Sequence, residues 1–363
     1  SQMLGCLTER LQAISADATL TCFGQEFNPE TYAIAKADML IKGGNASGMK
    51  YGDTLSDDAF SGYEFDYIIS NPPFGIDWKR EKTQVESEAK RGFDGRFGPG
   101  LPAISDGQML FLLNGVKKLK TGSGRMAIIQ NGSSLFTGDA GSGASEIRRY
   151  VIEGDLVEAI IQMPTDLFYN TGISTYIWVL TKGKTMQRSG RVQLIDASKC
   201  YVKRRKNIGN KRVDLDDACI RLILRAYEGF ADETCEDNGL IVESKVFDNR
   251  FFGFTKVTVE TAQTDEHGKP ILKKGKRQPV KGASDTEIIP LSEDIDAYMK
   301  KNVLPYNPLA YIDPAKDKIG YEVPLTRLFY QFVPPTPSDE IFAEIKELEA
   351  EESALMKELF GNA

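Results

Sequence analysis

The chain has 363 residues, enough for two or three domains of about 150 residues each or for one large α/β domain with appendages. Hydrophobic residues make up 41% and charged residues 27%, which excludes wholesale disorder, and no apolar run reaches the roughly 18 residues of a membrane span. The net charge is −7, so the average composition does not point to a nucleic-acid-binding protein.

Cysteine and histidine usage narrows the chemistry further. The five cysteines are scattered without a C-x-x-C pair, which favours reduced thiols in a cytoplasmic protein. The single histidine, His267, lies in a Lys-rich polar stretch, so we expect neither a metal site nor His-dependent nucleophilic catalysis. No basic segment followed by an apolar run marks a secretory signal, and we expect no membrane partner.

Apolar periodicity predicts helices and strands in alternation over the first half of the chain. A helix is expected over residues 2–14, where apolar side chains recur every three to four positions. Asn28 as the cap and Pro29 as the first residue predict a second helix, which Gly43 and Gly44 end. Further helices are expected at 105–124 and 142–154. Strands are expected at 18–27, 49–55, 64–74, 125–131, 155–164 and 174–182.

This alternation predicts an α/β fold with a mostly parallel, twisted sheet and helices on both faces. In such sheets ligands bind at the carboxyl ends of the strands. Four polar residues follow the expected strands at that edge: Glu26, Asp53, Asn71 and Asn131. Residues 76–104, rich in Gly, Lys, Glu and Pro, interrupt the pattern and predict a long loop.

The charges are unevenly distributed. Residues 182–212 contain eleven Lys or Arg and one acidic residue, and residues 269–281 contain six and none, so both segments suit contacts with phosphates. A flexible solvated loop explains 269–281 equally well. Residues 338–363 contain eight acidic residues and two Lys and predict an amphipathic helix with coiled-coil character, which docks either on a partner or on its own domain.

The strongest indication of chemistry is Asn71-Pro72-Pro73-Phe74 at the end of an apolar strand. Two prolines in succession end the strand in a rigid turn, which fixes the directions of the Asn71 side chain and the Pro72 carbonyl. Two fixed acceptors can bind both hydrogens of a planar exocyclic amine and free its lone pair for attack. Phe74 is placed to stack on the ring that carries the amine.

Two carboxylates upstream fit a nucleoside cofactor. Glu26 ends a strand, where a carboxylate can accept both hydroxyls of a ribose. Asp53 follows the next strand and can accept an adenine amine, with Phe27 and Leu55 as walls for the adenine ring. Each residue alone is a weak indication, because an acidic residue after a strand is common.

In this order, Glu26, Asp53 and the Asn71–Phe74 turn resemble the motifs of S-adenosylmethionine-dependent amino-methyltransferases that act on adenine in DNA. Longer segments closely resemble the modification subunit of type I restriction–modification systems, and they cover almost the whole chain. The segments are SNPPFGIDWK, GRFGPGLPAISDGQMLFL, the stretch from GRMAIIQNGSSLF to WVLTKGK, RVQLIDASKCYVKRRKNIGNKR and IGYEVPLTRLFYQFVPP.

The resemblance implies a role for each matching residue. Asn71, Pro72, Pro73 and Phe74 would hold and activate an adenine flipped out of duplex DNA, because the amine is inaccessible inside the stack. Phe168 or Tyr169 would supply the second stacking face. Glu26, Phe27, Asp53 and Leu55 would hold S-adenosylmethionine. The implied partners are double-stranded DNA, a specificity subunit that reads the DNA sequence, and a restriction subunit.

The chain departs from the family at its start. The family carries a Gly-rich D-P-x-x-G-x-G turn after its first strand and a helical domain before it, and neither precedes Ser1. We therefore interpret the sequence as a fragment. We expect one of three arrangements: a gap in the sheet, a substitute strand, or residues lost upstream. For a fragment we expect weak or no cofactor binding.

The resemblance divides the chain into a Rossmann-like methyltransferase domain at 1–183, incomplete at its N-terminus, a C-terminal extension at 184–335 with the basic stretches, and an amphipathic helix at 336–363. Two other functions are considered. One is a non-catalytic fragment or scaffold that binds DNA or the specificity subunit. The other is a methyltransferase of protein glutamine or RNA, against which Phe74 and the downstream segments argue.

Overall fold

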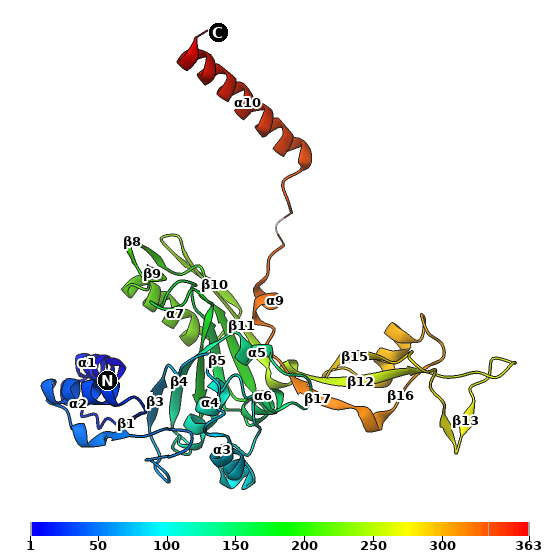
Figure 1. The fold of residues 1–363 in the computed structure, drawn as a ribbon, viewed down its shortest axis with the longest axis horizontal. Coiled ribbons are helices and arrows are strands. Elements are labelled where there is room, and N and C mark those ends of the chain that lie inside the picture. Colours follow the sequence, from blue (N-terminus) through cyan, green and yellow to red (C-terminus); the bar gives the residue numbers. More distant parts are fainter. Residues whose placement is uncertain (1, 333, 362–363) are drawn as a thin grey trace. The chain divides into compact units, whose positions relative to one another are not determined.

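The computed structural model of the chain describes residues 2–332 and 334–361 (Figure 1). Two compact units are formed, residues 1–325 and residues 326–363. The larger unit contains the strands β1–β17 and the helices α1–α8, and the smaller unit contains the helix α10. The short helix α9 (Leu325–Phe329) spans the boundary.

A seven-stranded sheet with the order β10-β11-β7-β5-β6-β4-β3 forms the centre of the larger unit. β3 pairs with β4 and β5 with β7 in parallel, whereas β6 and β11 run antiparallel to both neighbours. The bounds are β3 Tyr67–Ser70, β4 Arg125–Asn131, β5 Val157–Gln162, β6 Thr175–Thr181, β7 Arg191–Asp196, β10 Glu233–Asp237 and β11 Leu240–Asp248. The α/β class is confirmed, but the sheet is mixed instead of mostly parallel.

One reason for the mixed pairing is the turn between β10 and β11. Asn238 and Gly239 have φ values of 50° and 81°, the conformation of a two-residue hairpin turn, which joins antiparallel strands. The sheet also extends beyond the predicted domain boundary at residue 183. β7, β10 and β11 all follow that boundary and pair within the same sheet.

Two helices, α4 (Gln108–Lys117) and α7 (Asp217–Gly229), pack against this sheet. A third, α6 (Gly143–Glu153), packs against α4 and the strand β17 (Lys318–Tyr321) of a second sheet. α6 begins where Ser142 Oγ accepts a hydrogen bond from Ser145 N, and α7 begins where Asp216 accepts one from Cys219 N. α4 and α6 confirm the helices predicted over 105–124 and 142–154.

Residues 2–51 form a separate small layer. It contains α1 (Gln2–Ile14), β1 (Gly24–Glu26), α2 (Pro29–Ile41) and β2 (Met49–Tyr51). As predicted, Asn28 caps α2: its side chain accepts from Glu30 N at 2.9 Å and from Thr31 N at 3.0 Å. The strand predicted over 18–27 is only three residues long, because β1 has a ladder on one side only.

β1 and β2 pair in parallel with each other, and within the described residues neither pairs with the seven-stranded sheet. β3 is the edge strand of that sheet. This is the first of the three expected arrangements, a gap in the sheet. Aromatic packing bridges the two parts: Phe23 lies 5.7 Å from Phe60 and 5.5 Å from Phe65, measured between ring centroids.

The segment predicted as a long loop, residues 76–104, is largely structured. It contains α3 (Lys82–Ala89) and a 3-10 turn over Gly92–Asp94. Val85 and Phe97 are fully buried. The helix is not evident from the sequence because Val85 is its one buried residue and the rest of the segment is polar.

A second sheet lies in the same unit. Its long strand β12 pairs on one side with β15 and on the other with β16 and β17. Arg148 on α6 holds this sheet, since its buried guanidinium donates to the Tyr321 carbonyl at 2.6 Å. The elements are β12 Gly253–Thr261, β13 Leu272–Lys273, β14 Lys276–Arg277, β15 Asp285–Pro290, α8 Ile295–Tyr298, β16 Ala310–Ile312 and β17 Lys318–Tyr321.

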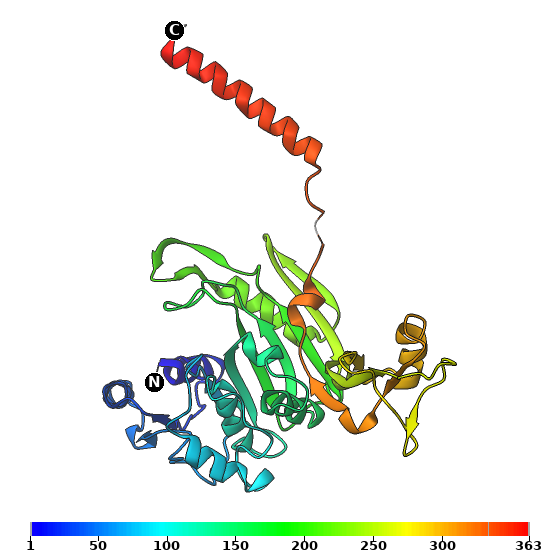
Figure 2. The ribbon, with the colours of Figure 1, turned by 45° about the vertical axis from the view of Figure 1, so that its right-hand side comes forward.

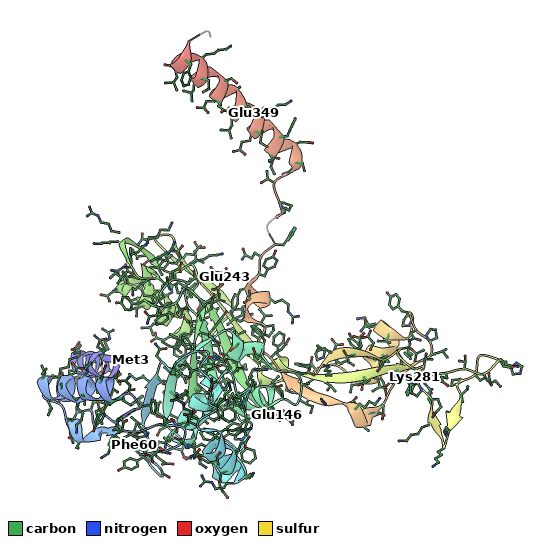
Figure 3. The ribbon with its side chains drawn as sticks, viewed as in Figure 1. Met3, Phe60, Glu146, Glu243, Lys281 and Glu349 are labelled. Carbon is green, nitrogen blue, oxygen red and sulfur yellow. The ribbon has the colours of Figure 1, made fainter. Side chains whose placement is uncertain are left out.

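The smaller unit contains α10 (Ser338–Phe360), which confirms the helix predicted near the C-terminus. None of its residues is buried, and side chains project from it on all sides, with Glu349 labelled (Figure 3). Its apolar residues Ile345, Leu348 and Leu355 are about half exposed. Within the described parts of the chain, no helix is both long and apolar enough to span a membrane.

Candidate active site

The Asn71–Phe74 turn lies at the carboxyl end of β3. The strand ends at Ser70, because Pro72 and Pro73 cannot donate to a ladder. Pro72 is buried, whereas Asn71 is exposed and its side-chain amide forms no hydrogen bond with a described residue. Phe74 is partly buried, and Gly75 follows with φ of 63°, which favours glycine. The Asn71 amide is therefore available to a ligand.

Backbone hydrogen bonds fix the exit of this turn. Gly107 N donates to Ile76 O at 3.0 Å, and Trp78 N donates to Ile104 O at 3.1 Å. The Trp78 indole is 2% exposed and donates to Ala103 O at 3.1 Å. The turn is thus held against the residues that immediately precede α4.

A buried polar network at the end of β4 lies next along the same edge. Gln108 is 1% exposed, and its amide nitrogen donates to Asp106 and to Asn131, both at 2.7 Å. Its amide oxygen accepts from Asn131 N at 3.0 Å, and Ser133 Oγ donates to Asp106 at 2.7 Å. Sequence reasoning identified Asn131 by its place after a strand but missed Gln108, for which the pattern carries no signal.

The two predicted cofactor carboxylates lie at the ends of adjacent parallel strands. Glu26 ends β1 and accepts from Asn28 N at 2.8 Å, and Asp53 follows β2 and accepts from Leu55 N at 2.8 Å. Phe27 is 59% exposed, whereas Leu55 is buried. Glu26 is in register with Tyr51, and Asp53 follows two residues later, so both acids lie at the carboxyl end of the strand pair that the gap separates from β3.

Arg96 joins this region to the segment that follows the Asn71–Phe74 turn. Its guanidinium is nearly buried and donates to Thr54 O at 2.6 Å and to Leu55 O at 3.0 Å. It also pairs with Glu88 on α3 at 2.6 Å. Burial alone would raise the pKa of Glu88, but the hydrogen bonds and charge of Arg96 outweigh it and lower that pKa.

A further carboxyl group approaches the predicted cofactor residues from the start of α3. Burial, and then the neighbouring Asp53 carboxylate, raise the pKa of Glu81. Glu81 and Asp53 are therefore close, although 28 residues separate them in the chain. The segment after the Asn71–Phe74 turn is thus brought to the end of β2.

The predicted stacking residues lie in the loop that joins β5 to β6, residues 163–174, called here the β5–β6 loop. Because β4 and β5 both run antiparallel to β6, their carboxyl ends share an edge, so this loop lies on the same edge as Asn71. Phe168 is partly buried and forms a bridge with Thr171, and Tyr169 is 56% exposed. Asp166 turns the loop with φ of 56°.

This edge therefore combines an exposed amide on a rigid turn with two aromatic side chains, and the pair of carboxylates lies across the gap on the strand pair β1–β2. A planar ligand with an exocyclic amine matches the first two features. The described residues contain no cluster of His, Cys, Asp or Glu that could hold a metal ion.

Comparison with known proteins assigns the fold to a family. A family model for N-6 DNA methylases matches residues 3–266, well over half of the chain. The chain belongs to the N-6 DNA methylase family. The matched region contains the seven-stranded sheet, the Asn71–Phe74 turn and the β5–β6 loop.

Several relatives of this chain are methylase subunits of type I restriction enzymes. The chain is 28% identical over 252 residues to the MjaIX methylase subunit of Methanocaldococcus jannaschii, covering 69% of this chain and 41% of that protein. It is 27% identical over 289 residues to the HindI methylase subunit of Haemophilus influenzae, covering 78% and 61%. The chain thus spans about half the length of these relatives.

A solved structure is also similar. The methyltransferase subunit of a type I restriction–modification system from Streptococcus thermophilus matches with a TM-score of 0.55 and 28% identity, covering 68% of this chain and 48% of that chain. The predicted resemblance to this family is confirmed.

Proposed function

We propose that this chain is the catalytic part of an adenine-specific DNA methyltransferase subunit of a type I restriction–modification system. It transfers a methyl group from S-adenosylmethionine to the 6-amino group of a flipped-out adenine. The observation that carries this proposal is the exposed Asn71 amide on the Pro72–Pro73 turn at the carboxyl end of β3, in a chain of the N-6 DNA methylase family.

The turn activates the amine without an acid–base residue. The Asn71 side-chain oxygen and the Pro72 carbonyl accept the two amine hydrogens, which draws the nitrogen towards a tetrahedral geometry and directs its lone pair outward. Phe74 stacks on one face of the adenine. Phe168 or Tyr169 covers the other face, and flipping is required because a stacked base cannot reach this turn.

The two carboxylates fit the nucleoside part of S-adenosylmethionine, which supplies the methyl group when bound. Glu26 uses one oxygen for Asn28 N and keeps the other for ribose hydroxyls. Asp53 accepts from Leu55 N and lies beside the Glu81 carboxyl group, and we assign it to the adenine amine, which would bind there in place of Glu81. Phe27 offers its exposed ring to the adenine, and Leu55 closes the pocket behind it.

The partners of this activity are double-stranded DNA, a specificity subunit that reads its sequence, and a restriction subunit. The relatives are named as subunits of type I restriction enzymes, which supports assembly. The helix α10 has no buried residue and contains both acidic and apolar side chains, which suits it to packing against another helix. We place the complex in the cytoplasm, where its DNA lies.

The alternatives fit less well. A methyltransferase of protein glutamine or RNA does not explain a family match that extends to residue 266. A scaffold that binds DNA without catalysis is favoured by one observation, the gap between β1 and β3, which separates the cofactor carboxylates from Asn71.

Methyl transfer from tritium-labelled S-adenosylmethionine to an adenine-containing duplex tests the proposal, with and without a specificity subunit. Asn71→Ala should lower transfer by about 10²- to 10³-fold, as removal of one preorganised hydrogen-bonding group does. Asn302→Ala, at an exposed Asn outside this edge, is the matched control and should leave transfer unchanged. Equal transfer by the Asn71→Ala variant would overturn the proposed mechanism, and DNA binding without any transfer would support the scaffold.

A further inference from the structure

A two-stranded hairpin next to the β5–β6 loop carries an unusual charge. It consists of β8 (Val202–Ile208) and β9 (Lys211–Asp214) and is called here the basic arm, residues 202–214. The arm contains six Lys or Arg and one acidic residue in a chain of net charge −7. Its strands belong to no larger sheet and are mostly exposed (Figure 2).

Most of these cations are free to bind an external anion. Arg204 and Lys211 both pair with Asp214, the latter at 2.9 Å. The other four are exposed and form no ion pair with any residue in the described parts of the chain. These four are Lys203, Arg205, Lys206 and Arg212.

The arm is bonded to the backbone of the β5–β6 loop. Asn210 N donates to Tyr169 O at 2.9 Å, and Arg212 N donates to Asp166 O at 2.9 Å. The Lys211 ammonium lies 5.3 Å from the centre of the Tyr169 ring, a cation–π contact. Any movement of the arm is therefore transmitted to the segment that contains both predicted stacking residues.

The fit at the tip of the arm is tight. Gly209 has φ of 58°, and a Cβ atom at this position would lie 2.6 Å from Tyr169 O. At the root, Leu215 follows β9 and Leu167 precedes the stacking residues, and both pack against one buried core. The arm and the loop are thus joined at two ends.

We propose that the basic arm binds DNA phosphates next to the target base, and that this contact positions the β5–β6 loop for stacking. The inference rests on the proposed function and adds the element that couples backbone binding to base capture. Duplex DNA is favoured over an acidic protein because the arm lies beside the loop that would receive the base. A two-stranded ribbon also fits the width of a major groove.

Charge removal tests the binding step. In the full 363-residue chain, the four free cations are replaced by Gln, as Lys203→Gln, Arg205→Gln, Lys206→Gln and Arg212→Gln. The matched control removes four charges from exposed lysines outside both basic segments: Lys300→Gln, Lys301→Gln, Lys346→Gln and Lys357→Gln. Fluorescence anisotropy with a labelled duplex gives the affinity between 50 and 200 mM salt.

Each phosphate contact contributes about 0.9 to the slope of log affinity against log salt. Four contacts therefore account for about a 10²-fold fall in affinity over this fourfold change in salt. The arm variant should lose that part of the salt dependence, and the control should keep it. The proposal would be overturned if the arm variant showed the same salt dependence as the unmodified chain. It would also be overturned if the arm variant and the control variant lost the same part of the salt dependence. The proposal would also be overturned if the arm variant kept its binding to DNA but lost binding to an acidic protein.

A second variant tests the coupling with all charges kept. Gly209→Asn tolerates the positive φ but places a Cβ against Tyr169 O. Gly239→Asn is the control, because its φ is also positive and an added Cβ meets nothing within 4 Å. DNA should slow hydrogen exchange of the loop amides in the control and not in Gly209→Asn, while the salt slope stays the same in both. Equal protection in the two variants would refute the coupling.

The two proposals fail in different ways. Salt-dependent binding through the arm without methyl transfer contradicts the proposed function and retains the arm as a DNA contact. If the arm variant transfers methyl groups as fast as the unmodified chain, the result contradicts the arm proposal and leaves the proposed function intact.

Discussion

Arg96 should contribute more to stability than any exposed ion pair of the chain, because it connects the end of β2 to α3. Its guanidinium is 7% exposed, and Glu88 opposite is 13% exposed. Arg96→Met keeps the apolar stem and the bond from its own N–H to Glu88, but removes the guanidinium that neutralises Glu88 and donates to the carbonyls of Thr54 and Leu55. Removing one partner of a buried pair costs about 3–5 kcal/mol.

We expect about 3 kcal/mol, at the lower end of that range, because Arg91 lies 3.6 Å from the same carboxylate and partly compensates its charge. Urea unfolding followed by circular dichroism measures this loss. Arg91→Met is the matched control: its side chain is 63% exposed, so we expect less than about 0.5 kcal/mol. Hydrogen exchange over residues 53–60 should accelerate in the Arg96 variant alone. Equal stabilities of the two variants would refute the assigned role of Arg96.

Three further predictions concern acid stability, the polar network and the cofactor. Burial alone would raise the pKa of Asp155, but hydrogen bonds from Lys184, Gly190 N and Asn249 outweigh it and lower that pKa. The contribution of Asp155 to the free energy of unfolding is therefore complete above the unfolded pKa of about 3.9 and is lost as the pH falls through the lower folded value. In urea unfolding, Asp155→Asn should make the stability less dependent on pH below about 4. An unchanged pH dependence would contradict this. Gln108→Leu leaves the Asn131 N–H without its acceptor, whereas the Asn131 side chain keeps its hydrogen bonds from Ser133. We therefore expect a loss of about 1–3 kcal/mol in urea unfolding, against no change if water replaces the amide. The chain alone should bind S-adenosylmethionine weakly, because no strand joins β1 to β3 within the described residues, and a micromolar dissociation constant by calorimetry would show that the gap does not matter.

Much of the fold was predictable because its signals are local. Asn28 and Pro29 specify the start of α2 through a cap and a fixed φ, and the structure begins the helix there. The two prolines after Ser70 end β3 for a reason that holds in any protein. The place of Asn71 at a sheet edge follows directly from this ending.

Other features depend on contacts between distant segments and could not be predicted. The structure of residues 76–104 rests on Arg96, whose partners lie 41 and 42 residues earlier in the chain. In the sequence, Gln108 is simply a polar residue near the start of a helix. Its burial and its hydrogen bond with Asn131 are evident only in the structure. The continuation of the sheet beyond residue 183 depends on β11 returning to pair with β7, which periodicity does not specify.

The unpaired edges of β1 and β3 have a consequence for handling the protein. An edge strand presents a row of backbone donors and acceptors that a strand of another molecule can pair with. Tyr67 on β3 is 65% exposed, so no bulky neighbour shields this edge. We expect the chain to self-associate by strand addition as its concentration rises, and a short peptide that pairs with β3 should keep it monomeric in sedimentation experiments.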